Sequence, residues 1–183
     1  MLNFINTFNA EFLTKINCYL SGDEAIHLLT NQFREPTELR FVCASREGYA
    51  TLVDNLYNND IGSLFLSGMA PKLLGNIKGD MYGRYMLVEF DGNPIKITFA
   101  NAMFPVTSEP SSLPLATLSK ESLFTEKLTA LDEHIDHPDL LEQDFQDLIA
   151  MQRIWGDIQE SVLTSAGSRA TETYLKRLNT NLS

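Results

Sequence analysis

An acid and a base occupy alternating positions in the segment "ELRFVCA", which has the pattern of a half-buried strand. Glu38 and Arg40 share one face, while Leu39 and Phe41 point to the other. A second predicted strand carries Thr98, which we expect in the same layer. A carboxylate on such a face could hold a metal ion, whereas an arginine keeps its proton and repels one.

A lysine and two aspartates interrupt the helical pattern of the second half. Lys127 lies on the apolar stripe that includes Phe124 and Leu128, where lysine is uncommon. Either its aliphatic stem packs while the amine reaches water, or the amine is paired or functional. Asp144 and Asp147 lie along one side of the next predicted helix, as a solvated edge or with Asp147 facing Lys127.

The remaining residues with reactive side chains form no known catalytic pattern. The three histidines lack ligand spacing, and those of "DEHIDHPD" suit a solvated loop better than a metal site. Cys18 and Cys43 lie in apolar segments, which predicts buried free thiols. No Ser/His/Asp, P-loop or dinucleotide motif is visible in the sequence.

The elements that must position these residues form a mixed α/β first half. Apolar spacing predicts one helix over 3–19 and another after the Gly22 turn, before the strand that starts at Glu38. Ser45 is a predicted N-cap of the next helix. Segment 61–80 suggests two short strands, and Asp91-Gly92 predicts the turn of a hairpin.

A Pro/Ser-rich connector over 106–114 is the predicted domain boundary. We therefore expect an α/β core over 1–108 and a helical region over 114–183, with helices that begin near Ser119 and Pro138 and two shorter ones beyond. The predicted fold class is α/β (α+β): a mixed sheet flanked by helices, followed by a C-terminal helical bundle.

The 183 residues are 44% hydrophobic and 21% charged, with a formal net charge of -10. This composition is globular, and the charge disfavours non-specific binding to nucleic acid or an anionic membrane. The first twenty residues lack the basic leader and apolar run of a signal peptide, and no segment has the length of a membrane-spanning helix. We therefore expect a cytoplasmic protein.

The order of four motifs resembles the AbiEii/AbiGii-type nucleotidyltransferases, toxin-family members of the DNA polymerase β-like superfamily. The motifs are "LSGDEAI" with "REPTELRFVCAS", then "GDMYGRYMLVEFDGNPIKITFANA", "LSKESLFTEKLTAL" and "EQDFQDLIAMQRIWG". The likeness runs from about residue 18 to about residue 175. It implies a cleft in which strand carboxylates hold two divalent metals and a glycine turn approaches a nucleoside triphosphate.

The sequence departs from this pattern on the strands. The resemblance assigns Glu38, Arg40 and Thr98 to the three metal-binding acid positions, so their charges sum to zero instead of about minus three. Arg40 would repel a metal, and we expect no bound metal. Arg40 could pair with Glu38, or its guanidinium could hold a phosphate directly in place of a metal.

The nucleotide-binding turn also differs from the family's pattern, whereas the helical part agrees with it. After Gly22, Asp23 and Glu24 replace a second glycine and a small hydroxyl residue, and two acids would repel a triphosphate. Lys127, Asp144 and Asp147 match the family's pattern, and the resemblance assigns Lys127 and Asp147 to the lysine and aspartate that complete the family's site. The resemblance thus predicts that these side chains meet Glu38, Arg40 and Thr98 in one degenerate pocket.

Three functions follow from the resemblance. The first is a catalytically impaired relative that acts by binding or regulation, with a paralogous or cognate toxin or antitoxin protein as partner and no cofactor. The second is an active enzyme that moves NMP from an NTP to tRNA or protein with Mg²⁺, in which Glu89 or Asp80 joins Glu38 as metal ligand. The third is a pure interaction domain without a nucleotide site.

Overall fold

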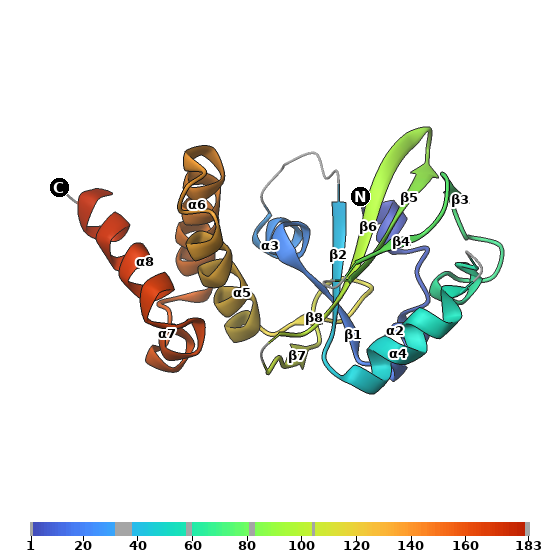
Figure 1. Ribbon diagram of the computed structural model, residues 1–183, viewed down its shortest axis with the longest axis horizontal. Helices are drawn as coiled ribbons and strands as arrows, with labels where there is room; N and C mark the ends of the chain where they lie inside the picture. The colour runs from blue at the N-terminus through green and yellow to red at the C-terminus, as the bar shows by residue number, and fades with distance from the viewer. Residues whose placement is uncertain (1, 32–37, 58–59, 81–82, 104, 182–183) are drawn as a thin grey trace. The chain divides into compact units, whose positions relative to one another are not determined.

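The computed structural model describes residues 2–31, 38–57, 60–80, 83–103 and 105–181. The chain forms two compact units, Met1–Leu118 and Ser119–Ser183. Figure 1 shows the first unit in blue to yellow and the second in orange to red. Each unit is described below by itself.

The first unit is built on a mixed sheet with the strand order β3-β5-β6-β2-β1-β8-β7, and β4 pairs with β5. Pairs β2–β6 and β1–β8 are parallel and the others are antiparallel. This confirms the predicted mixed α/β class. The strands are β1 (Cys18–Ser21), β2 (Glu38–Cys43), β3 (Lys72–Leu73), β4 (Lys78–Gly79), β5 (Gly83–Phe90), β6 (Asn93–Asn101), β7 (Ser108–Glu109) and β8 (Thr117–Leu118).

Strands β2 and β6 alternate as their sequences predict. Leu39, Phe41, Ile97 and Phe99 are fully buried, and the rings of Phe41 and Phe99 stack with centroids 5.3 Å apart. The parallel register places Glu38 beside Lys96 and Arg40 beside Thr98 on the opposite face. One face of the sheet therefore anchors the core, and the other carries polar side chains.

The two longer helices of the first unit, α3 (Gly22–Thr30) and α4 (Arg46–Asn55), follow β1 and β2 in the chain. The Ser45 hydroxyl accepts a hydrogen bond from the Gly48 N–H, which confirms the predicted N-cap. Helix α3 ends at Asn31, whose left-handed backbone (φ 54°) stops the helix. Residues 32–37, between α3 and β2, lie outside the described residues.

The predicted single helix over 3–19 is wrong. The chain instead forms α1 (Leu2–Ile5), α2 (Ala10–Lys15) and strand β1. Phe8 makes a bridge with Phe65, far away in sequence, and Asn9 caps α2 through Phe12 N–H. The phenylalanines that mimic one helical stripe are thus shared between two helices, because a distant partner interrupts the local pattern.

The hairpin agrees with its sequence, and the segment before it agrees only partly. Asp91 (φ 50°) and Gly92 (φ 77°) both adopt the positive φ angles that a two-residue hairpin turn needs. In 61–80, the first predicted strand is a 3₁₀ helix, η2 (Gly62–Leu64). The second predicted strand contributes only β3, and β4 follows it.

The sheet extends beyond the predicted end of the α/β core at residue 108. Strand β7 pairs with β8, and β8 pairs with β1, so the first unit ends at Leu118. The second unit contains α5 (Lys120–Glu133), α6 (Pro138–Trp155), α7 (Glu160–Ala166) and α8 (Ser168–Asn181). Ser119 caps α5 and Pro138 occupies the first turn of α6, as predicted.

The core of the second unit is a helical bundle in which α5 packs against α6, α7 and α8. Its fully buried side chains include Leu123, Leu128, Leu131 and Leu148. Among helices of the described residues, none combines the length and the hydropathy needed to cross a membrane. In the first unit, Cys18 and Cys43 are buried free thiols that face each other across β1–β2, which confirms the prediction.

Candidate functional site

A polar pocket of about 430 Å³ opens on the face of the sheet that carries Arg40 and Thr98. Its walls come from β2, β5, β6 and Asp80. We call it the β2–β6 pocket; it is lined by Arg40, Asp80, Gly83, Tyr85, Lys96, Thr98 and Ala100. Every one of these residues belongs to the first unit.

Glu38 lies beside this pocket, and neighbours on β6 engage both of its carboxylate oxygens. The Thr98 hydroxyl donates to Oε1 at 2.5 Å, and the Lys96 ammonium donates to Oε2 at 3.0 Å. The Glu38 and Lys96 side chains are 39% and 47% exposed. The carboxylate is therefore neutralised by a partner on the adjacent strand.

Arg40 lies against the glycine turn. It is opposite Ser21 in the β1–β2 ladder, and Gly22 follows with a φ of 71°. A Cβ atom on Gly22 would lie 3.3 Å from the Cβ and Cδ atoms of Arg40. The turn thus needs glycine for its backbone conformation and for close packing on the arginine side chain.

The two acids after Gly22 differ in environment. Asp23 is exposed, whereas Glu24 is buried, with a relative accessibility of 6%. Burial raises the pKa of the Glu24 carboxyl to about 7 from an ordinary 4.5, and nearby His27 partly offsets this. Glu24 is therefore partly protonated at neutral pH, and it does not present the full exposed charge that the sequence suggested.

Lys96, Tyr85 and Asp80 complete the pocket. Lys96 Nζ lies 5.9 Å from the centroid of the Tyr85 ring, and an Asp80 carboxylate oxygen accepts the Gly83 N–H at 3.0 Å. Alternation along β6 already indicated that Lys96 and Thr98 share a face, so this pattern could have identified Lys96. Glu89, the other acid considered as a metal ligand, lies 4.0 Å from Lys72 and does not line the pocket.

In the second unit, a buried cluster surrounds Lys127. Its ammonium lies 2.9 Å from Asp144 Oδ1 and 3.1 Å from Asp147 Oδ2, and all three side chains are at most 6% exposed. The amine is therefore paired with α6 and does not reach water as a snorkelling side chain would. The prediction that Asp147 faces Lys127 is confirmed.

His134 joins this cluster from the end of α5. Its Nδ1 atom lies 2.6 Å from Asp144 Oδ2, and its side chain is 33% exposed. The sequence suggested a solvated loop for this histidine, because spacing along the chain does not reveal a contact with the next helix. We refer to Lys127, His134, Asp144 and Asp147 as the Lys127 cluster.

The predicted site residues thus fall into two groups, each assembled within its own unit. Glu38, Arg40 and Thr98 share one face of the sheet in the first unit. Lys127 and Asp147 form an ion pair in the second. That both groups form one pocket remains a prediction.

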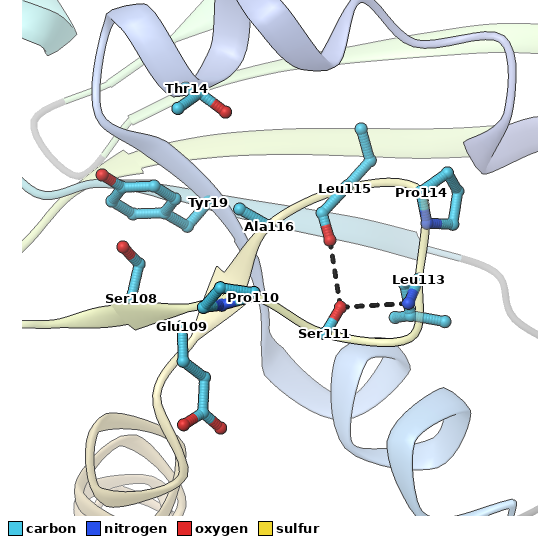
Figure 2. Close-up of a pocket in the computed structure, with 10 residues that line it drawn as sticks. All are labelled: Thr14, Tyr19, Ser108, Glu109, Pro110, Ser111, Leu113, Pro114, Leu115 and Ala116. Carbon is cyan, nitrogen blue, oxygen red and sulfur yellow. Dashed lines mark hydrogen bonds between the residues drawn. The ribbon is translucent and has the colours of Figure 1, made fainter.

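A second pocket of the first unit, about 370 Å³ in volume, lies at β7 and β8 (Figure 2). The Ser111 hydroxyl accepts the Leu113 N–H and donates to the Leu115 carbonyl, both at 3.1 Å, and so fixes the loop between the strands. Among the described residues that line it, only Glu109 is charged. These contacts hold the loop and indicate no reaction.

Comparison with solved structures identifies the architecture. An antigenic nucleotidyltransferase-like protein from Paracoccidioides brasiliensis superposes with a TM-score of 0.57 and 12% identity, covering 93% of this chain and 84% of that one. The chain has a nucleotidyltransferase-like fold. A candidate nucleotidyltransferase from H. pylori is more distant, with a TM-score of 0.48, 14% identity and coverage of 97% and 93%. No protein-family model and no curated protein matches the sequence.

In a nucleotidyltransferase-like fold the question is whether the β2–β6 pocket suits divalent metals. Magnesium prefers carboxylate and other oxygen ligands. The pocket has one acid in its lining, Asp80, beside the cations Arg40 and Lys96, and the neighbouring Glu38 is already neutralised by Lys96. These residues do not fit a pair of divalent metals.

Proposed function

We propose that this nucleotidyltransferase-fold chain acts by binding and is impaired in metal-dependent nucleotidyl transfer. The proposal rests on one observation: the Glu38 carboxylate accepts hydrogen bonds from the Lys96 ammonium and the Thr98 hydroxyl, and Arg40 lies on the same face beside Thr98. A divalent ion would have to displace the Lys96 ammonium and approach the Arg40 guanidinium.

The electrostatic cost of such an ion is large. A divalent cation ~4 Å from one guanidinium is repelled by about 8 kcal/mol at an effective dielectric constant of about 20, before solvent screening reduces it. A single compensated carboxylate does not offset this repulsion. Chemistry that needs two metals is therefore disfavoured in the β2–β6 pocket.

The proposal also covers the family to which the chain is related and the protein that it binds. The motif order supports an AbiEii-type relative, and a catalytically impaired relative can still regulate an active paralogue or a cognate toxin or antitoxin through its surface. On this view the chain needs no cofactor. Mg²⁺ and NTP become relevant only if the enzyme is active.

An active enzyme is the second candidate, and Asp80 is the observation in its favour. This carboxylate lines the same pocket as Thr98, so it could serve a single metal together with Glu38. Glu89 is excluded from this role, because its carboxylate lies by Lys72 outside the pocket lining.

The test is transfer of labelled NMP from each of the four NTPs to total tRNA and to protein, with and without Mg²⁺. We expect no transfer. Mg²⁺-dependent transfer that disappears in both Glu38→Ala and Asp80→Asn would establish the enzyme and reject the proposal. Transfer that survives both changes and co-purifies with the chain would place the activity outside the β2–β6 pocket, and it would also reject the proposal. Lys127→Ala is unsuitable here, because removing a buried charge also destabilises the fold.

A further inference from the structure

The β2–β6 pocket brings two cations together on a strongly acidic chain. The formal net charge of the protein is -10, yet Arg40 and Lys96 both line this pocket with one acid, Asp80. Both cations are exposed and come from adjacent parallel strands. Because Glu38 pairs with Lys96 at 3.0 Å and Asp80 lines the pocket, an anion would engage the exposed donors of the two cations and not a net positive charge.

The donors of these side chains suit a phosphate group. Arginine offers five N–H donors in a planar fork, so it can serve a ligand in addition to its contacts within the protein. Lys96 has three N–H donors, and one of them donates to Glu38 Oε2 at 3.0 Å. Hydrogen bonds between such cations and phosphate oxygens are short and strong.

Two small residues are part of the pocket lining. Gly83 and Ala100 pair across β5–β6, and a Cβ atom on Gly83 would lie 2.3 Å from the Phe99 carbonyl oxygen. No larger side chain fits there without moving the backbone. The pocket volume of about 430 Å³ suits a small molecule, and Tyr85 is part of the lining.

We propose that the β2–β6 pocket binds a small phosphate monoester directly through Arg40 and Lys96, without a divalent metal. This inference rests on the proposed binding function, because a metal and these two cations exclude each other. The phosphate takes the place that metals would need, and the Tyr85 ring packs against the organic part of the ligand.

The substitution Glu38→Gln distinguishes a metal site from a direct phosphate site, because the two sites predict opposite changes in ligand affinity. In a metal site Glu38 is a ligand, so Glu38→Gln weakens nucleotide binding. In a direct phosphate site Glu38 competes with the ligand for Lys96, so Glu38→Gln strengthens it. Glutamine has almost the same shape and its amide oxygen can still accept from Thr98, so the main change is one negative charge.

The experiment is calorimetric titration of the full chain in EDTA with inorganic phosphate and with adenosine 5′-monophosphate, and adenosine is the phosphate-free control. We expect both phosphates to bind and adenosine not to bind. Arg40→Gln and Lys96→Gln should each weaken binding about tenfold, the range of a lost charge-assisted hydrogen bond. Glu38→Gln should strengthen it by about two- to fivefold, as expected for a partly exposed charge pair.

Lys72→Gln is the matched control, because this exposed lysine lies on the same sheet outside the pocket. It should leave the affinity unchanged, and unfolding curves should show that every variant is folded. Tighter binding of adenosine 5′-monophosphate than of inorganic phosphate would indicate that the ligand is an organic monoester, whereas equal affinity would reduce the inference to a site for phosphate alone and overturn the monoester.

The failure modes of the two proposals differ. No binding in EDTA, or binding that Arg40→Gln and Lys96→Gln leave unchanged, overturns the phosphate site while the absence of nucleotidyl transfer stands. Binding that requires Mg²⁺ and is weakened by Glu38→Gln overturns the phosphate site. If Mg²⁺-dependent transfer accompanies it, the proposed function fails as well.

Discussion

Charged side chains of this protein are paired at two very different degrees of burial. The Glu38–Lys96 pair is partly exposed, so solvent screens it and its contribution to stability is small. Lys127, Asp144 and Asp147 are almost completely buried, so their mutual pairing is needed to offset desolvation. A substitution in the first pair therefore reports on binding, and one in the second reports mainly on folding.

The sequence identified the Lys127 cluster only in part. A lysine on an apolar stripe predicts either a snorkelling or a paired amine, and the choice depends on how α6 is rotated against α5. That rotation is a tertiary property. For the same reason the sequence did not predict the contact between His134 and Asp144, which connects the end of α5 to α6.

Lys127→Met should destabilise the protein by about 3–5 kcal/mol, because it leaves two buried aspartates without their cation while the side-chain volume is preserved. Urea denaturation of the variant and the parent measures the difference. Lys120→Met, at an exposed position of the same helix, should change stability by less than about 0.5 kcal/mol. Adding Asp144→Asn and Asp147→Asn to Lys127→Met should recover part of the loss. A small effect of Lys127→Met alone would mean that the ion pairs are solvated.

Titration of Glu24 should make the free energy of unfolding decrease as the pH rises. Its pKa is about 7 in the folded chain and near 4.5 when unfolded, so between these values the folded chain holds a proton that the unfolded chain has lost. Stability from this group is complete below pH ~4.5 and is lost as the pH rises towards 7. We therefore expect Glu24→Gln to stabilise the protein by about 1–2 kcal/mol at pH ~8 and to have little effect at pH ~4.

Urea denaturation at both pH values tests this expectation. Glu47→Gln is the control, because Glu47 occupies the first turn of α4 as Glu24 occupies the first turn of α3, but it is exposed. Its effect should be the same at both pH values. Equal stabilisation by Glu24→Gln at the two pH values would contradict a raised pKa.

At the scale of elements, local signals were sufficient wherever an element is specified by its own residues. The hairpin has its Asp91-Gly92 turn, α4 has the Ser45 cap, and α5 has the Ser119 cap. The elements that differ from prediction depend on distant partners. Phe8 bridges to Phe65, and β8 forms by pairing with β1, about 97 positions earlier in the chain.

The register of β2 and β6 leads to a prediction about restoring a metal site. Because Arg40 and Thr98 are direct neighbours and Glu38 shares their face, Arg40→Asp with Thr98→Glu would place three carboxylates on adjacent strands. We expect the double variant to bind Mn²⁺ at least about tenfold more tightly than the parent, since one repulsive charge is replaced by attractive ones. Calorimetric titration measures this.

The control for the restored site carries the same change in charge elsewhere. Arg46→Asp with Thr51→Glu alters two exposed positions of α4 and also adds three negative charges. The affinity of this control variant for Mn²⁺ should exceed that of the parent by at most about twofold, because solvent and salt screen surface charges. Equal gains in both double variants would show that total charge, and not the β2–β6 face, determines metal affinity.

At the scale of the whole molecule, a net charge of -10 coexists with the two cations of the β2–β6 pocket. A long nucleic acid is repelled by the negative charge of the whole surface. A small phosphate ligand, in contrast, interacts mainly with the side chains of the pocket. The fold class could be predicted from the sequence because the alternation of elements is a property of the whole chain. The balance of charge inside one pocket could not, because Asp80 lies outside the strands and no periodic pattern places it beside Lys96.

The full chain should therefore not bind a non-specific 25-base-pair duplex at ~0.15 M salt, with a dissociation constant weaker than ~10⁻⁴ M, because few phosphates could be neutralised and few counterions released. Fluorescence anisotropy with labelled duplex DNA and RNA measures this. Lowering the salt to ~0.05 M should strengthen binding by less than about tenfold, since a single pair of cations releases at most about two counterions. Binding below 10 μM with a steep salt dependence would instead reveal an extended basic surface, and it would contradict the exclusion of non-specific nucleic acid as a partner.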